Sequence, residues 1–259
     1  MQYSNKYIFG FTALICLVCS MMISISAVGL RERQERNKLL DKQKSVLQAC
    51  WLLQPGERVS MAEVEKRFEN VESMVIDLES GMPQEGVDPV TFDAATAMRP
   101  VESNITQLPE LPAQVCVYTQ MEGGKAKTLI LPIQGKGLWS TLHGFLALDA
   151  DTKTIRGLTY YLHAETPGLG GEVDNPKWKS KWKGRLAFDD SWNVAIGLKK
   201  GGAGSVEEDP YNVDSLSGAT LTSRGVENML QYWLSEDGYG KFLKNYRDGK
   251  VAAQPQGSA

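Results

Sequence analysis

Five hydroxyl side chains crowd one short stretch, residues 214–224, with the sequence DSLSGATLTSR. A serine or threonine hydroxyl is inert near neutral pH unless a base lies beside it. The charged neighbours in sequence are Asp214, Arg224 and Glu227, no histidine is close, and the G-x-S-x-G motif is absent. We therefore expect these hydroxyls to accept a modification rather than to attack a substrate.

This stretch leads directly into residues 225–238, whose apolar side chains recur at helical spacing on one face. The first amide groups of a helix lack partners and carry partial positive charge, which suits a phosphate. A cap from Thr222 or Ser223 would stabilise the helix by about 1 kcal/mol. One cap leaves the other hydroxyls unexplained, so a phosphate-bearing group at this helix start is the alternative.

Four glycine-rich pieces lie in the same half of the chain: GKGLW at 135–139, ETPGLGGE at 165–172, KGGAG at 200–204 and LSGAT at 216–220. None completes the dinucleotide motif G-x-G-x-x-G or the P-loop motif G-x-x-x-x-G-K-[ST]. Nucleotide binding by either fingerprint is therefore disfavoured. Each piece alone is as compatible with a tight turn, because glycine is the usual residue where φ must be positive.

Composition narrows the function classes. The 259 residues are 42% hydrophobic and 23% charged, with a net charge of -3, which is typical of a globular protein. No broad basic field is present, so nucleic acid is a poor choice of partner. The two histidines, His143 and His163, lie on unlike segments and argue against a histidine-rich metal site or a serine–histidine triad. We expect chemistry that does not depend on imidazole.

Residues 7–30 form an uncharged run of 24 residues. A helix rises about 1.5 Å per residue, so such a run can span a hydrocarbon core of roughly 30 Å. A cleaved signal peptide is the alternative, but its apolar region would be too long and no small-residue cleavage site follows. The sequence predicts a single transmembrane helix.

The charges around this run favour a cytoplasmic domain. Lys6 precedes the run and a cluster of basic residues follows it, which by the positive-inside rule places the bulk of the protein in the cytoplasm. Large domains can be translocated despite flanking charge, so the rule does not decide alone. The following basic residues are Arg31, Arg33, Arg36, Lys38, Lys42 and Lys44.

The four cysteines point to no special chemistry. Cys16 and Cys19 lie in the apolar run, Cys50 near the end of the next helix, and Cys116 in a strand-like segment. They form neither a disulfide framework nor a zinc spacing, so we interpret them as small apolar residues.

The elements that must position the hydroxyl stretch follow from periodicity. Strand patterns around turns at residues 122–125 and 149–153, a further strand in VAIGLKKGG and the helix of 225–238 predict an α+β domain, an antiparallel sheet with packed helices. We divide the chain into residues 1–30 as N-terminal tail and transmembrane helix, 31–53 as an amphipathic stalk helix, 54–115 as the irregular first part of the soluble domain, 116–249 as its core and 250–259 as a disordered tail.

The sequence DSLSGATLTS resembles the S/T-G-A-T flavinylation motif of the NqrC family, the C subunits of the bacterial sodium-translocating NADH:quinone reductases. The resemblance extends, in order, over SAVGLRERQ, GKGLWS, GLTYYLHAETPGLGGEVDNPKW, KGGA and WLSEDGYGKFLKNYRDG. It covers the anchor and residues 116–249 closely and residues 54–112 loosely. In that family the threonine that closes the motif is esterified by the phosphate of FMN, which implies covalent FMN on Thr220 in an FMN-binding domain.

The resemblance also implies a flavin pocket. Trp139 and Leu169 would offer faces to the isoalloxazine ring, and Lys200 would donate hydrogen bonds together with amides of the glycine loops. Glu165 or Thr166 would bond the polar edge of the ring. Trp139 could instead belong to the core, and Lys200 could be a solvated lysine. The implied residues are Trp139, Glu165, Thr166, Leu169, Gly170, Lys200, Ser217, Gly218, Ala219, Thr220, Leu221 and Thr222, with Asp214 as a recognition residue for the flavin transferase that attaches FMN.

The implied function is electron transfer within a membrane complex of six subunits that oxidises NADH, reduces ubiquinone and exports sodium. The chain has no NADH fingerprint and one span, so other subunits must complete both activities. The family places the anchor in the bacterial cell inner membrane and the domain in the periplasm, against the flanking charges. The alternatives are the G subunit of the related electron-transport complex and a membrane-anchored interaction module without a cofactor.

Overall fold

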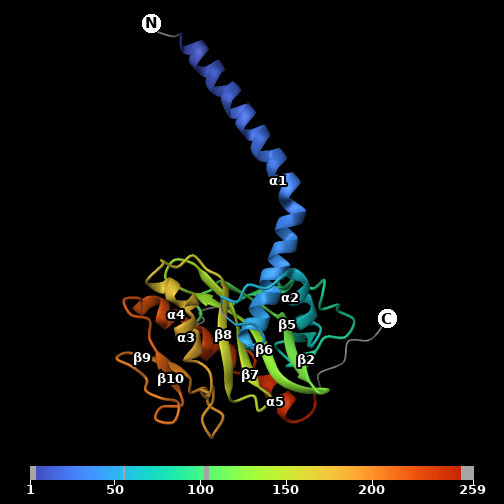
Figure 1. The fold of residues 1–259 in the computed structure, drawn as a ribbon, viewed down its shortest axis with the longest axis vertical. Coiled ribbons are helices and arrows are strands. Elements are labelled where there is room, and N and C mark those ends of the chain that lie inside the picture. The colour runs from blue at the N-terminus through green and yellow to red at the C-terminus, as the bar shows by residue number, and fades with distance from the viewer. Residues whose placement is uncertain (1–3, 55, 102–104, 252–259) are drawn as a thin grey trace. The chain divides into compact units, whose positions relative to one another are not determined.

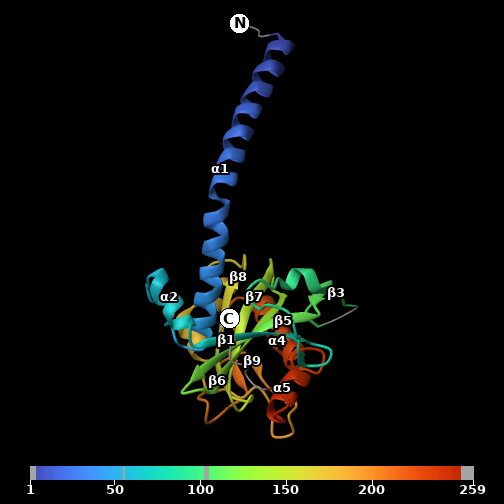
Figure 2. The same cartoon turned by 90° about the vertical axis from the view of Figure 1, so that its right-hand side faces the viewer.

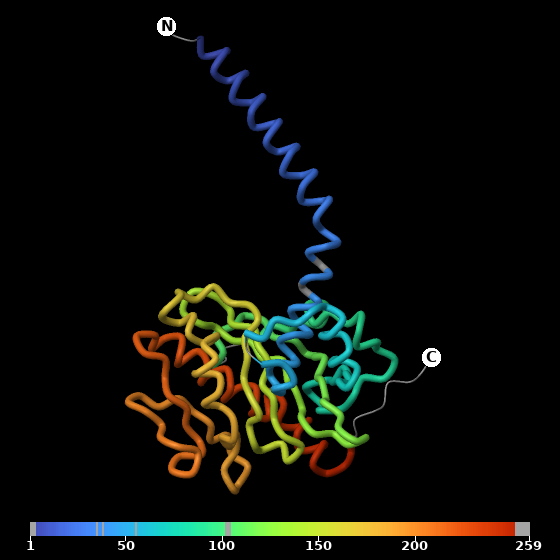
Figure 3. The backbone as a smooth tube through the Cα atoms, in the orientation of Figure 1, coloured from blue at the N-terminus to red at the C-terminus, as the bar shows by residue number. Residues whose placement is uncertain are grey.

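The computed structural model describes residues 4–54, 56–101 and 105–251. It contains two compact units, residues 1–42 and 43–259. Helix α1 (Asn5–Ala49) begins in the first unit and ends in the second. Figure 1 shows the elements in chain order, and Figure 3 shows the path of the backbone.

The first unit contains the apolar part of α1 and the charged turns that follow it, up to Lys42. Among the described residues, α1 is the one helix long and apolar enough to cross a membrane, with a mean hydropathy of 2.4 over an 18-residue window. Its large apolar side chains lack protein cover, since Phe9 is 75% exposed and Val28 is 76% exposed. Such a surface is unfavourable in water and stable among lipid tails, which agrees with the predicted membrane anchor.

A six-stranded antiparallel sheet forms the centre of the second unit, with strand order β2-β1-β5-β6-β7-β8. Both predicted hairpins are present, because Glu122 pairs with Lys125 across the first turn and Leu148 pairs with Ile155 across the second. The strands are β1 (Val71–Asp77), β2 (Met82–Pro83), β5 (Gln114–Glu122), β6 (Lys125–Lys136), β7 (Thr141–Asp149) and β8 (Ile155–Leu162).

Helices cover both faces of this sheet. One face packs against α4 and α5, and the other packs against α2 and the end of α1 (Figure 2). Side chains along β7 alternate between the two cores, since Leu146 lies in the first and Phe145 in the second, as the period of two along a strand requires. The predicted α+β class is confirmed. The helices are α2 (Met61–Phe68), α3 (Pro176–Ser180), α4 (Thr220–Leu234) and α5 (Gly240–Arg247), with 3-10 segments η1 (Ala94–Ala97) and η2 (Gly170–Asp174).

Helix α4 approaches the sheet closely at Gly225. A Cβ atom at this position would lie 2.2 Å from the backbone oxygen of Lys136, at the end of β6. One turn further along the helix, Met229 packs so tightly on Gly135 that a Cβ there would lie 3.0 Å from the Met229 Cβ. The two glycines let helix and strand meet, and this contact fixes the first turn of α4 beside the β6–β7 turn.

Two segments differ from the prediction. Residues 54–115, predicted as irregular, contain β1, which pairs with β5 along its whole length, and the short antiparallel pair of β3 (Met98–Pro100) and β4 (Glu110–Pro112). The strand predicted in VAIGLKKGG is only β9 (Gly197–Lys199), and it pairs in parallel with β10 (Asn212–Asp214). The sequence around β1 hides the strand because its buried residues do not alternate.

Candidate functional site

Helix α4 begins at Thr220. A cap from Thr222 or Ser223 would require the helix to begin after that residue. Ala219 occupies the N-cap position and makes no side-chain cap. Thr222 and Ser223 therefore lie inside the first turn, and the prediction that one of them caps the helix is wrong. Both point inward: the Thr222 hydroxyl donates to Glu165 Oε2 at 2.7 Å, and the Ser223 hydroxyl accepts from the Leu216 amide at 2.9 Å.

The start of α4 has free hydrogen-bond donors. Within the described part of the chain, the backbone amides of Thr220, Leu221 and Thr222 have no hydrogen-bond partner. Thr220 itself is exposed at the first helical position. Three unpaired amides at the positive end of a 15-residue helix attract an anion. A phosphate on the Thr220 hydroxyl would lie next to them.

Large apolar side chains on the segments that meet near this helix start face solvent. Trp139 is 67% exposed and Leu169 is 44% exposed, so Trp139 is not a core residue. Leu138 and Leu221 are exposed by 42% and 54%. Exposed large apolar side chains on neighbouring segments are typical of surfaces that bind a ligand or a partner.

Gly218 brings Leu169 close to the attachment stretch. Its φ of +72° suits glycine, and a Cβ atom at this position would lie 3.0 Å from Leu169 Cδ2. Any side chain here would be strained and would push Leu169 away. The loop of residues 165–171 and the stretch before α4 therefore meet through this glycine.

Glu165 is a buried carboxylate, 5% exposed, that joins three segments. Its Oε1 accepts from the amides of Trp139 at 2.9 Å and Ser140 at 3.2 Å, and its Oε2 accepts from the amide of Leu138 at 3.3 Å as well as from Thr222. Burial by itself raises the pKa of Glu165, but these hydrogen bonds outweigh it and hold the pKa below its ordinary value. All four donors belong to the protein itself, and the contact predicted between Glu165 and the flavin edge stays a prediction.

Asp214 is also engaged within the protein. Its carboxylate forms an ion pair with Lys181 and accepts from the Ala203 amide at 2.6 Å. Its backbone oxygen accepts from Trp178 Nε1 at 2.8 Å. The hydrogen bond from Lys181, followed by that from Ala203, lowers the pKa of Asp214. The side chain of Asp214 is 29% exposed, so part of it is accessible to solvent.

The remaining predicted residues occupy different settings. Ser217, Thr166 and Lys200 are exposed, and Lys200 has no ion-pair partner among the residues the structure describes. Lys200 follows β9, which is tied to the hydroxyl stretch because the Ser215 amide donates to the Lys199 oxygen at 3.0 Å. Within the described ranges, no side-chain hydrogen bond or ion pair joins Lys200 itself to the other predicted site residues.

Sequence reasoning missed two polar side chains at this site. His163 Nδ1 accepts from the Glu165 amide at 3.2 Å, and the Ser140 hydroxyl accepts from the Ala164 amide at 2.7 Å. Both hold the backbone on either side of Ala164. The one indication in the sequence is that His163 lies two residues before Glu165. The presence of only two histidines had argued against any role for imidazole.

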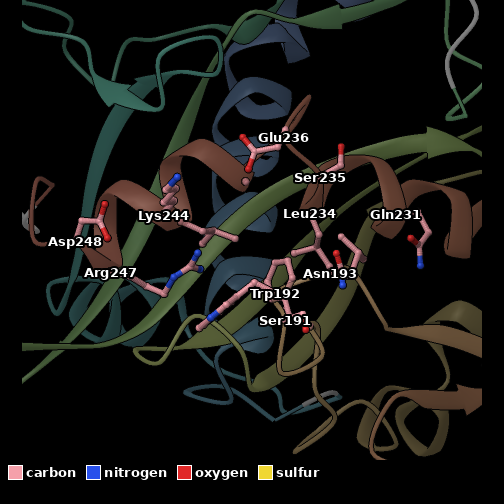
Figure 4. Close-up of a pocket in the computed structure, with 14 residues that line it drawn as sticks. Ser191, Trp192, Asn193, Gln231, Leu234, Ser235, Glu236, Lys244, Arg247 and Asp248 are labelled. Carbon is pink, nitrogen blue, oxygen red and sulfur yellow. The ribbon is translucent and has the colours of Figure 1, made fainter.

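A separate hollow of about 740 Å³ lies at the other end of α4 (Figure 4). Gln231 and Leu234 from α4 line it, together with Lys244 and Arg247 from α5. The Arg247 guanidinium lies 3.6 Å from the centroid of the Trp192 ring. Because Gln231 and Leu234 belong to the last turn of α4, the hollow is not part of the site at its first turn.

Known proteins share this fold and sequence. The family described as the FMN-binding domain matches residues 137–235. The C subunit of the Na(+)-translocating NADH-quinone reductase of Yersinia pestis is 44% identical over 250 residues, 92% of this chain and 91% of that protein. Its counterpart from Pseudomonas aeruginosa is 42% identical over 247 residues, 92% and 94% of the two chains.

A crystal structure gives the same result. NqrC of Shewanella oneidensis superposes with a TM-score of 0.74 at 31% sequence identity, covering 83% of this chain and 99% of that chain. The matched FMN-binding domain contains Trp139, Glu165 and the start of α4, where the site lies. The chain belongs to the NqrC family, the C subunits of the Na(+)-translocating NADH-quinone reductases.

Proposed function

We propose that this chain carries FMN, joined through its phosphate to the Thr220 hydroxyl, and relays electrons in a membrane complex that oxidises NADH and reduces quinone. The observation that carries the proposal is the exposed Thr220 at the start of a 15-residue helix whose first amides have no partners. A phosphoester at Thr220 would gain charge-assisted hydrogen bonds there.

Attachment requires a donor and an enzyme. In this proposal a flavin transferase uses FAD: the bond between Thr220 Oγ1 and phosphorus forms while the pyrophosphate bond of FAD breaks. AMP leaves, and the hydroxyl proton passes to a base of the transferase or to water. No histidine lies in residues 214–224, so the chain itself offers no strong base for this step. Asp214 would be a contact for the transferase through the exposed part of its side chain.

The apolar surface suits the ring of the cofactor. Bound FMN supplies the reversible uptake and release of electrons, and this chain holds and orients it. Trp139, Leu169 and Leu221 offer exposed faces beside Thr220. Such an open site suits a carrier that exchanges electrons with partner proteins, because a partner can approach the ring edge closely.

The openness of the site explains a covalent link. A shallow surface binds a free cofactor weakly, whereas a short tether raises its local concentration to roughly the millimolar range. The proposed position of the domain in the periplasm strengthens this argument, because a lost cofactor would not be replaced there.

Partners are part of the proposal. A chain with one candidate span among its described residues needs other subunits for NADH oxidation and for sodium export. We propose a complex of six subunits in the bacterial inner membrane, anchored here by α1, with sodium export coupled to electron transfer. The related proteins from Yersinia pestis and Pseudomonas aeruginosa, named for Na(+) translocation, support this assignment.

Denaturing electrophoresis tests the proposal. The full-length chain is expressed with a flavin transferase, boiled and illuminated in the gel. We expect a fluorescent band for the wild type and for Thr220→Ser, which keeps a hydroxyl, and none for Thr220→Val, which keeps the shape. A dark wild-type band would instead favour an interaction module without a cofactor.

A further inference from the structure

His163 accepts a hydrogen bond from the backbone of Glu165, the residue whose carboxylate joins the segments of the site. Glu165 connects the turn that carries Trp139 to the first turn of α4, through three amides and the Thr222 hydroxyl. Because Glu165 is 5% exposed and its bonds are made within the protein, it acts on a bound cofactor through the residues it holds. Its own position must therefore be fixed by something else.

Two glycines confine the Glu165 carboxylate. A Cβ atom at Gly137 would lie 2.6 Å from Oε1, and a Cβ atom at Gly170 would lie 2.6 Å from Oε2. These distances are shorter than nonbonded contacts in proteins, so neither site accepts a larger residue without displacing the carboxylate. The carboxylate has one place in the structure, and a shift of the Glu165 backbone moves it out of register with its four donors.

His163 fixes that backbone. Its Nδ1 accepts from the Glu165 amide at 3.2 Å, and its Nε2 lies 2.8 Å from Asp174 Oδ2. A ring nitrogen that accepts a hydrogen bond carries no proton, so the neutral ring holds its proton on Nε2 and donates it to Asp174. The hydrogen-bond network thus assigns one tautomer to His163, whose side chain is 13% exposed.

Asp174 is anchored in turn. Its Oδ1 lies 3.0 Å from Lys179 Nζ, and Lys179, with a side chain 8% exposed, also donates to Thr159 Oγ1 on β8 at 3.1 Å. The charged groups facing His163 are therefore Asp174 from η2, Lys179 from α3 through Asp174, and Glu165 on its own loop.

We propose that His163, as a neutral imidazole held by Asp174, is a positioning residue that keeps Glu165 in register and thereby sets the placement of the Trp139 turn relative to Thr222. That this arrangement orients FMN rests on the proposed function, whereas the hydrogen bonds that link Asp174, His163 and Glu165 do not.

The cofactor-independent test uses the full-length Thr220→Val chain, which has no attachment hydroxyl. Hydrogen–deuterium exchange at neutral pH follows residues 137–142 in this background with His163, His163→Gln and His163→Ala. Glutamine can accept and donate at the same time, as a neutral imidazole does. We expect slow exchange with His163 and glutamine, and faster exchange with alanine. Equal exchange in all three would overturn the proposal.

The second test uses the flavinylated full-length chain at one fixed neutral pH, read by visible circular dichroism of the flavin. We expect His163→Gln to keep the wild-type spectrum and His163→Ala to change it. His143→Ala replaces the other histidine and should keep the wild-type spectrum.

A wild-type flavin spectrum in His163→Ala would contradict the role of His163. Asp174→Asn is the second variant, because it keeps the size of the side chain and weakens the hydrogen bond with Nε2. It should speed exchange in residues 137–142 as alanine at 163 does, and unchanged exchange would contradict the role of Asp174.

Discussion

Thr220 and Thr222 lie two residues apart at the start of α4 and meet opposite surroundings. Thr220 is exposed, whereas Thr222 is 0% exposed and donates to Glu165 at 2.7 Å. Positions two residues apart on a helix differ by about 200° around its axis. One hydroxyl is therefore available for modification, and the other holds the turn that positions it.

Replacing Thr222 with valine tests this division. Valine keeps the shape but removes a hydrogen bond to a buried carboxylate, so we expect the free energy of unfolding to fall by about 1–3 kcal/mol. Covalent flavin should still be attached, because Thr220 is untouched. Thr220→Val is the matched control, with little effect on stability because the residue is exposed. Urea denaturation and in-gel fluorescence measure the two outcomes; equal stability losses would contradict the division.

Glu165 should give the domain a specific acid sensitivity. Its pKa is lowered from an ordinary value of 4.5 because the hydrogen bonds it accepts outweigh burial. A carboxylate with a depressed pKa stabilises the folded state at pH values above its ordinary pKa. This stabilisation is lost as the pH falls through the pKa of the folded state. Between about pH 7 and about pH 3, wild type should therefore lose more unfolding free energy than Glu165→Gln.

Denaturant titrations at the two pH values measure this difference. Glu165→Gln should already be less stable than wild type near neutral pH, because the amide offers fewer acceptors to the four donors. Glu236 is exposed, and Glu236→Gln should keep the wild-type pH dependence. A Glu165→Gln chain with the full wild-type acid loss would show that the carboxylate is not the source.

Trp139 should matter to the cofactor and not to folding. Its side chain is 67% exposed, so Trp139→Ala removes little buried area. A lost stacking face costs about 1 kcal/mol of contact with the ring. We expect iodide to quench flavin fluorescence more efficiently in Trp139→Ala, and Trp139→Phe to restore part of the protection. Trp192→Ala, in the separate hollow, is the control, and a change as large there would contradict the assignment.

The side of the membrane needs its own measurement, because the charges flanking the span favour the cytoplasm. We expect a reporter that is active only in the periplasm to be active when fused after Gly249. A reporter active only in the cytoplasm, fused at the same residue, serves as the reciprocal control. Activity of the cytoplasmic reporter alone would contradict the proposed orientation and the argument about cofactor loss.

The hairpins could be predicted because their signals are local. The turn at Gly123 and Gly124 is flanked by strand residues, and the turn after Asp149 likewise. The start of α4 was harder to predict from the sequence, because serine and threonine side chains favour caps and turns as strongly as the first helical turn. Ala219, a poor capping residue, ended in the N-cap position.

The contact at the centre of the site, between Thr222 and Glu165, could not be predicted from the sequence. Thr222 and Glu165 are separated by 57 residues, and nothing local shows that they meet. The role of Glu165 follows only once Gly170 and Gly137 are seen to enclose its carboxylate. The fold shows that Glu165 accepts hydrogen bonds from the protein's own turn at residues 138–140 and from the first turn of α4.

The mass of one tryptic peptide shows whether FMN is attached to Thr220. Trypsin should release residues 201–224 from the full-length chain, and this peptide contains Thr220 together with the other four hydroxyl side chains of residues 214–224. We expect a mass increase of one FMN less one water, with fragmentation placing it on Thr220. An unmodified peptide from a host that contains the transferase, or FMN on another residue, would contradict it.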